Sequence, residues 1–124
     1  MAQRDTNPNP ALRDDIRDED RRLIREFFAH TGSGNHTKHR YATQLGEFAA
    51  WLIHPRTTRK GTGGLLAATR ADVVRFASYL SSGDRYAASA KVLDRSRVLS
   101  DSARKNYLSA LKSMYEYLIL VDLV

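Results

Sequence analysis

The sequence predicts an all-α fold, a small four-helix bundle. Four stretches carry apolar residues at the three- and four-residue spacing of a helix face, and strand-like alternation is nearly absent. The chain has 124 residues, no internal repeat and only three prolines, which suits one domain with a modest core. Its hydrophobic content of 42% and charged content of 27% are typical of a globular protein.

The first predicted helix covers about residues 11–30. Its apolar positions recur at helical spacing: Leu12, Ile16, Leu23, Ile24, Phe27 and Phe28. Residues 13–22 are dense in charge, and they either form a solvated helix or fray. Gly32 and Gly34 follow, and both suit a helix C-cap and a turn.

The second predicted helix covers about residues 36–53 and is amphipathic. Its apolar stripe consists of Tyr41, Leu45, Phe48 and Leu52. Either Asn35 or Thr37 can serve as its N-cap. Pro55 ends the helix, and a basic loop follows.

The third predicted helix covers about residues 70–81. Thr69 and Asp72 match the spacing of a capping box at its start. Its inward positions are Val73, Phe76, Ala77 and Leu80. Residues 82–98 are polar and irregular, and their middle could form a short helix. Loops of this length in a small domain often bind a partner.

The fourth predicted helix lies within residues 99–121. Ser100 is a good N-cap, and Leu99 can act as a hydrophobic staple. The buried stripe consists of Leu108, Leu111, Met114, Tyr115 and Leu118. The outer face is polar and consists of Ser102, Lys105, Asn106, Ser109 and Lys112. Arg104 projects near the apolar side.

The last seven residues, "LILVDLV", contain no glycine or proline stop signal and no polar tail. We therefore expect Val124 to be an artificial or truncated end. The apolar tail would then pack under the bundle or against a following segment.

The sequence gives little support for catalytic or metal chemistry. There is no cysteine, which excludes disulfides and cysteine-based zinc sites. His36 and His39 lie three residues apart, but the chain contains neither H-E-x-x-H nor G-x-x-x-x-G-K-[ST]. We expect no metal and no cofactor. The first residues, "MAQRDTNPNP", lack the apolar core of a signal peptide, and no run approaches the ~18 apolar residues of a membrane span. We therefore expect a cytoplasmic protein without a membrane partner.

The net charge of +6 is unevenly distributed. Residues 1–26 hold 6 basic and 7 acidic side chains, whereas residues 27–124 hold 14 basic and 7 acidic. We expect residues 1–19 to be a mixed-charge segment, either part of the first helix or disordered, and residues 20–124 to form the domain. A basic domain attracts polyanions, nucleic acid first among them.

The basic groups stand among small polar side chains. Lys and Arg neutralise phosphates, whereas Ser, Thr and Asn bond to phosphates or base edges, and a helix presenting them can lie in a major groove. The helical candidates for DNA contact are Thr37, Lys38, His39, Arg40, Thr43, Ser102, Lys105, Asn106, Ser109 and Lys112. The candidates in loops are Arg56, Arg59, Lys60, Arg95 and Arg97. The alternative interpretation is an ordinary solvated helix surface.

Three segments resemble the SAM-like N-terminal domain of the phage integrase family. They are "TKHRYATQLGEFAAWL" (37–52), "LLAATRADVVRFASYL" (65–80) and "LSDSARKNYLSALKSMYEYL" (99–118). They occur in the family's order and spacing. Gly34 and Ala103 depart from the pattern, because the family often has a hydroxyl residue at each of these helix starts.

The resemblance implies the core-binding domain of a tyrosine recombinase. Such a domain grips one face of the core recombination site in double-stranded DNA, beside other recombinase protomers, while a separate domain carries the tyrosine nucleophile. The family's H-x-x-R element is absent from this chain, and Tyr41, Tyr107 and Tyr115 match core positions of the binding domain. We therefore expect this chain alone to be catalytically inert.

Two other functions compete with this interpretation. A helical protein-interaction module could use the same basic faces on an acidic partner, with no autonomous DNA binding. A complete helix-turn-helix regulator is less well supported, because no short turn joins two helices at the required spacing.

Overall fold

Four α-helices make up most of the computed structural model, which describes residues 10–32, 34–53, 64–81 and 99–124. They are α1 (Asp18–Thr31), α2 (Asn35–Ile53), α3 (Arg70–Leu80) and α4 (Asp101–Leu120). A short 3₁₀ turn, η1 (Leu65–Ala67), precedes α3. The described part of the chain contains no strand, so the all-α prediction is confirmed for it. None of its helices is both long and apolar enough to cross a membrane.

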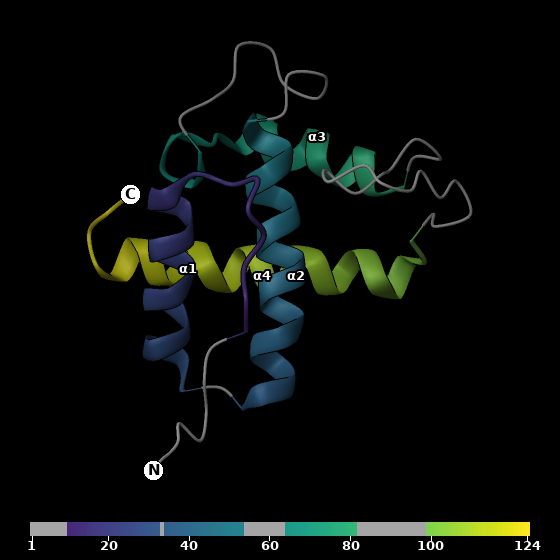
Figure 1. Cartoon of the computed structure of the whole chain (residues 1–124). Helices are drawn as coiled ribbons and strands as arrows, with labels where there is room; N and C mark the ends of the chain where they lie inside the picture. Colours follow the sequence, from purple (N-terminus) through teal and green to yellow (C-terminus); the bar gives the residue numbers. More distant parts are fainter. Residues whose placement is uncertain (1–9, 33, 54–63, 82–98) are drawn as a thin grey trace.

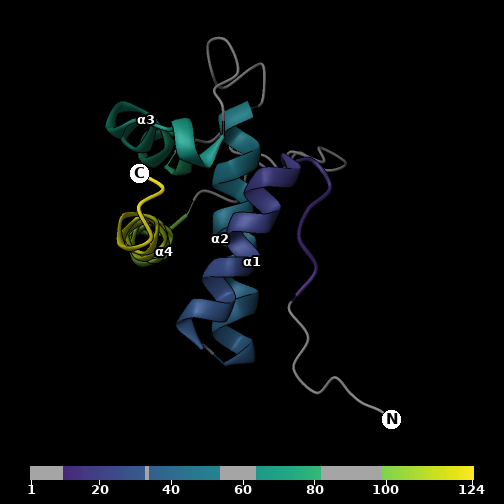
Figure 2. The same ribbon diagram turned by 90° about the vertical axis from the view of Figure 1, so that its left-hand side faces the viewer.

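The helices do not all run alongside one another. Helices α1 and α2 form an antiparallel pair, α4 crosses behind both of them, and α3 lies near the Ile53 end of α2 (Figures 1 and 2). Helices α2 and α4 each contact the other three. The two helices that carry most of the predicted DNA contacts therefore also hold the domain together.

Local capping explains where α3 and α4 begin. The Asp72 N–H donates to Thr69 Oγ1 at 3.2 Å, and the Thr69 N–H donates to Asp72 Oδ2 at 2.8 Å. This reciprocal pair is the capping box that the sequence predicts. At α4, Ser100 Oγ accepts from the Ala103 N–H at 3.1 Å, which confirms Ser100 as the N-cap.

The first two helices are joined by a short turn. Gly32 adopts φ +61° and its N–H donates to the Phe28 carbonyl, so it is the C-cap of α1, as predicted. Helix α2 begins within one residue of the predicted start, but the predicted N-cap was wrong. Both Asn35 and Thr37 lie inside the helix, and the Gly34 carbonyl accepts the first helical hydrogen bond from the Lys38 N–H.

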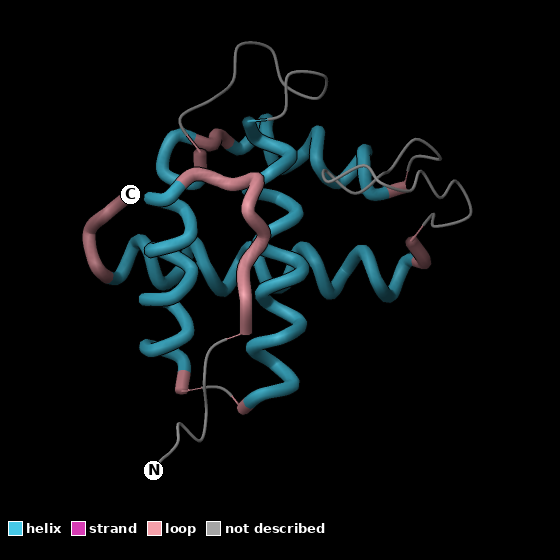
Figure 3. Tube along the Cα trace, in the orientation of Figure 1, coloured by secondary structure: helices cyan, strands magenta, loops and turns pink. Residues whose placement is uncertain are grey.

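The predicted start of the first helix was also wrong. Helix α1 begins at Asp18, and residues 10–17 run without helical structure along α2 (Figure 3). Leu12 and Ile16 are buried in the core from this strap, so their spacing of four residues mimicked a helix face. The Arg13 guanidinium pairs with Asp15 at 2.8 Å, and residues two apart do not face each other on a helix.

The core is rich in aromatic side chains. Phe48 lies at its centre, with its ring 4.9 Å from Phe76 and 6.1 Å from Trp51, measured between centroids. Most residues of the predicted apolar stripes are buried. Five of them are only partly buried: Tyr41, Val73, Ala77, Leu108 and Tyr115.

Leu65 is held by side chains from two other helices. Its N–H donates to Asp20 Oδ1 of α1 at 3.0 Å, and its carbonyl accepts from the Tyr115 hydroxyl of α4 at 2.6 Å. Gly64 precedes it with φ +86°, and a Cβ at that position would lie 2.5 Å from Asp20 Oδ2. Glycine is therefore required there by both backbone conformation and space.

The Asp20 carboxyl is fully buried. Burial raises its pKa, the Leu65 hydrogen bond and the Arg17 charge oppose that rise, and the Glu19 charge adds to it. The pKa of the Tyr115 hydroxyl is also raised, mainly by burial and then by the nearby Asp20 and Asp72 charges. Tyr115 therefore stays a hydrogen-bond donor to Leu65 at physiological pH.

Helix α4 ends in a hydrogen-bonded stop, although its last residues include no glycine or proline. Asp122 adopts φ +61°, the Leu123 N–H donates to the Leu118 carbonyl at 2.9 Å, and the Asp122 N–H donates to the Ile119 carbonyl at 3.0 Å. These two bonds form a Schellman motif, in which aspartate takes the left-handed position usually held by glycine. The following Leu123 and Val124 are exposed, so this end of the tail does not pack under the bundle.

We predict that Asp20→Asn changes how stability depends on pH. Asparagine keeps an oxygen that accepts from the Leu65 N–H, but it carries no charge to bury. Because the folded-state pKa of Asp20 is raised, the stability of the wild type should fall relative to the variant as pH rises above about 4. The loss should be about 1.4 kcal/mol for each unit by which that pKa is raised.

Urea unfolding of both proteins between about pH 4 and about pH 7 measures this dependence. Asp18→Asn is the matched control, because it removes a carboxylate of the same helical turn whose side chain is 99% exposed. A difference between wild type and Asp20→Asn that stays constant across this range would contradict the prediction.

We predict that Asp122→Gly stabilises the domain by about 1 kcal/mol, because glycine adopts the left-handed conformation without the steric cost that a Cβ carries. Thermal or urea unfolding measures the gain. Asp122→Ala removes the same carboxylate but keeps a Cβ, so it should give no such gain. Equal stabilisation by both variants would show that charge at the helix end, and not backbone strain, is responsible.

Candidate nucleic-acid interface

The outer face of α4 presents all five polar residues predicted for it. Each of them is exposed: Ser102, Lys105, Asn106, Ser109 and Lys112. The opposite face is buried and consists of Tyr107, Ala110, Leu111, Met114 and Leu118. Helix α4 thus carries a core stripe and a polar stripe on opposite sides.

Lys105 and Lys112 are available as cations on this face. They lie seven residues apart, about two helical turns, with Ser109 between them. Within the described part of the chain, no carboxylate forms an ion pair with either lysine. Two ammonium groups about 10 Å apart along one helix can each neutralise a phosphate of a polyanion.

Arg104 lies differently from the two lysines. Its guanidinium pairs with Asp101 one turn earlier, its side chain is 33% exposed and its Nε is buried. This agrees with the expectation that Arg104 projects near the apolar side of the helix. Its charge is already offset by Asp101, so it contributes less to the cationic face than Lys105 does.

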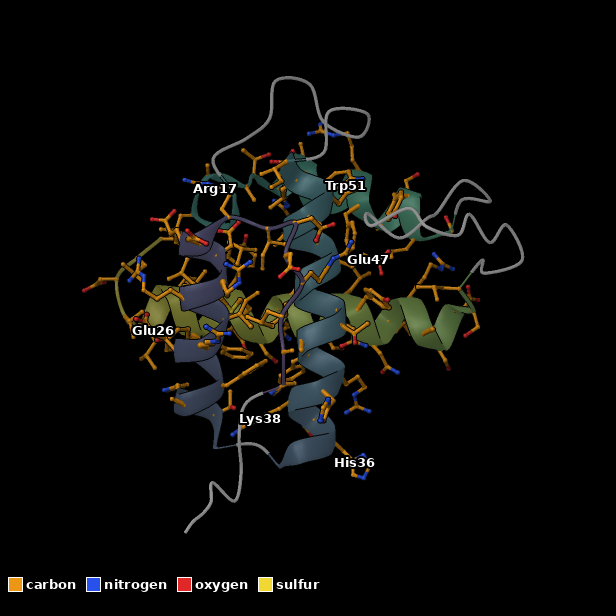
Figure 4. All side chains as sticks on the ribbon, viewed as in Figure 1. Arg17, Glu26, His36, Lys38, Glu47 and Trp51 are labelled. Carbon is orange, nitrogen blue, oxygen red and sulfur yellow. The ribbon has the colours of Figure 1, made fainter. Side chains whose placement is uncertain are left out.

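Helix α2 presents a second polar stripe. His39, Arg40 and Thr43 are exposed, and Thr37 is half-buried. Lys38 is 8% exposed, so its predicted place on the outer face was wrong. Figure 4 places Lys38 between the lower ends of α1 and α2, with His36 on the other side of α2.

The helical geometry explains the burial of Lys38. Ala42 and Leu45 follow it by four and seven residues on the same side of α2, and both are buried. A lysine in that row covers apolar surface with its long aliphatic stem. Its ammonium group is therefore not displayed beside the exposed side chains of His39 and Arg40.

A buried hydrogen bond joins α2 to α4. The Tyr107 hydroxyl donates to Glu47 Oε1 at 2.8 Å, and both residues are less than one-tenth exposed. Glu47 follows Thr43 by one turn on α2, and Tyr107 adjoins Asn106 on α4. The exposed stripe of α2 thus leads towards the point at which α4 crosses it.

This bond was not predicted. Tyr107 is a core residue, as expected, but no role was expected for Glu47. The available signal was the position of Glu47 as the lone charge in the run "LGEFAAWL". A carboxylate in such a run needs a polar partner when it is buried.

The remaining candidates cannot be placed. Arg56, Arg59, Lys60, Arg95 and Arg97 lie outside the described residues. Among the residues that the structure describes, no three His, Asp or Glu side chains gather closely enough to hold a metal ion.

Comparison with known proteins found no match to this chain. No model of a known protein family matches the chain, and neither does any curated protein sequence or solved structure.

Proposed function

We propose that this domain binds double-stranded DNA through the outer face of α4 and the exposed stripe of α2. The observation that carries the proposal is the pair Lys105 and Lys112, which are exposed, lie on one face and make no ion pair within the described residues. Their spacing suits two phosphates, while Asn106 and Ser109 offer hydrogen bonds to phosphates or base edges.

The shape of α4 supports contact within a groove. A helix of 20 residues is about 30 Å long, and its polar stripe carries short side chains between the two lysines. Short polar residues allow the helix to approach the floor of a major groove while the longer lysines reach the flanking backbone. Arg40 and Thr43 of α2 would then contact phosphates on one side of that groove.

The proposal extends to a SAM-like core-binding domain of a tyrosine recombinase. Its support is the ordered resemblance of three segments, which correspond to α2, η1 with α3, and α4. On this proposal a longer parent protein supplies the catalytic domain, and other protomers bind beside this one on the recombination site. The chain lacks H-x-x-R, so it would bind DNA without cutting it.

The competing proposal is a protein-interaction module that places the same cations on an acidic partner. The two proposals differ in one measurable respect. Binding to a duplex releases condensed counterions and weakens steeply with salt, and an isolated domain should bind in the ~10⁻⁴–10⁻⁶ M range. A module specific for a protein would show no such binding to a duplex.

We predict that Lys105→Ala/Lys112→Ala weakens DNA binding and makes it less sensitive to salt. Fluorescence anisotropy of a labelled duplex of about 20 base pairs at several salt concentrations measures both effects. Because each phosphate contact contributes about 0.9 to the slope of log K against log salt, the double variant should lose about 1–2 units of slope.

The control is Arg22→Ala/Arg25→Ala, which removes the same charge from exposed positions of α1. Its salt slope should stay close to that of the wild type. If both double variants lose the same slope, the attraction is spread over the surface and α4 is not the interface. If the folded wild type does not bind at low salt, DNA is not the partner of this domain.

A further inference from the structure

A groove lies between the start of α3 and the second half of α4. It encloses about 750 Å³. Its apolar lining consists of Ala68, Val73, Leu108, Leu111, Tyr115 and Ile119. Leu111 is buried and Val73, Leu108 and Tyr115 are partly buried, so the groove is an open edge of the hydrophobic core.

Exposed apolar side chains gather at the end of α4 and just after it, and one of them lines this groove. Among the described residues, five of the six large hydrophobic side chains that are exposed belong to the last six positions. They are Ile119, Leu120, Val121, Leu123 and Val124. Ile119 is 60% exposed and also lines the groove. Apolar side chains clustered in this way indicate an interaction surface more than scattered ones do.

Three charged side chains border the same groove. Lys112 and Glu116 lie one turn apart on α4, and Arg70 begins α3; all three are exposed and line the groove. The surface therefore carries an apolar hollow, an apolar projection and charges of both signs. The projection of one copy can fill the hollow of another, and a cation of one copy can face the anion of another. Such a patch can bind a copy of itself about a two-fold axis.

We infer that this groove binds a second copy of the chain, with the two α4 helices antiparallel. Lys112 of each copy then faces Glu116 of the other copy. In this antiparallel register, a residue that lies three positions after Glu116 faces one that lies three positions before Lys112. Ile119 of one copy therefore lies opposite Ser109 of the other copy. Ile119 thereby lies beside Leu108 and can enter the groove of the second copy.

This inference does not rest on DNA binding. The two surfaces share Lys112, so the antiparallel dimer would cover a lysine that the proposed function assigns to DNA. Self-association is therefore measured without DNA, and either proposal can fail without the other.

Sedimentation velocity of the wild type, from micromolar to submillimolar concentration, tests the inference. We expect a reversible monomer–dimer equilibrium. Lys112→Glu and Glu116→Lys should each weaken association by roughly tenfold or more, because each places like charges opposite one another twice in the dimer. Lys112→Glu/Glu116→Lys restores both pairs and should bring the dissociation constant back towards that of the wild type.

The apolar contact is tested by Ile119→Glu, which should abolish the dimer. Its matched control is Leu120→Glu, because Leu120 is 67% exposed but lines a different hollow, beside Phe27 and Tyr117. Both positions are exposed, so both variants should fold, as circular dichroism would verify. A wild type that stays monomeric, a double charge variant that is not restored, or equal losses in both glutamate variants would overturn the inference.

Discussion

The structure depends most on how one backbone unit, that of Leu65, is satisfied inside the protein. Its side chain is fully buried, and its N–H and carbonyl bond to Asp20 of α1 and Tyr115 of α4. A buried peptide group without partners costs free energy, so these two side chains fix where the chain enters η1 and α3. The same two bonds set the positions of α1 and α4 relative to the start of α3.

Both proposals place their contacts on α4, whose sides differ in chemistry. The side of α4 that carries Tyr107 packs into the core, and the Tyr107 hydroxyl bonds to Glu47. These contacts fix the orientation of the helix, so its outer face points away from the domain. The edge towards α3 stays apolar and open. Lys112 lies where the polar face meets this edge. A single substitution at Lys112 therefore affects both proposed contacts, whereas Lys105 and Ile119 separate them.

Much of the fold could be predicted from the sequence, because local signals and long-range packing agree over α2, α3 and α4. The capping box at Thr69 and the N-cap at Ser100 are local and were found. The strap of residues 10–17 was missed because burial against α2 can place Leu12 and Ile16 in the core without a helix. Lys38 was predicted to contact DNA because of its charge. The charge alone does not show that the aliphatic part of the side chain covers apolar surface and is buried. The Asp20 and Glu47 bonds join residues far apart in sequence. A local pattern can show that Glu47 needs a polar partner when it is buried, but not which residue provides it.

The sequence separation of the bonds that fix α4 has a consequence for how the domain folds. Helices α1 and α2 are joined by a short turn and can pair early, whereas Tyr115 reaches Leu65 across 50 residues and Tyr107 reaches Glu47 across 60. Closing such long loops costs entropy before the contacts form. We therefore expect the α1–α2 hairpin to fold first and α4 to dock last. The helix that carries the proposed interface would then complete the folded state.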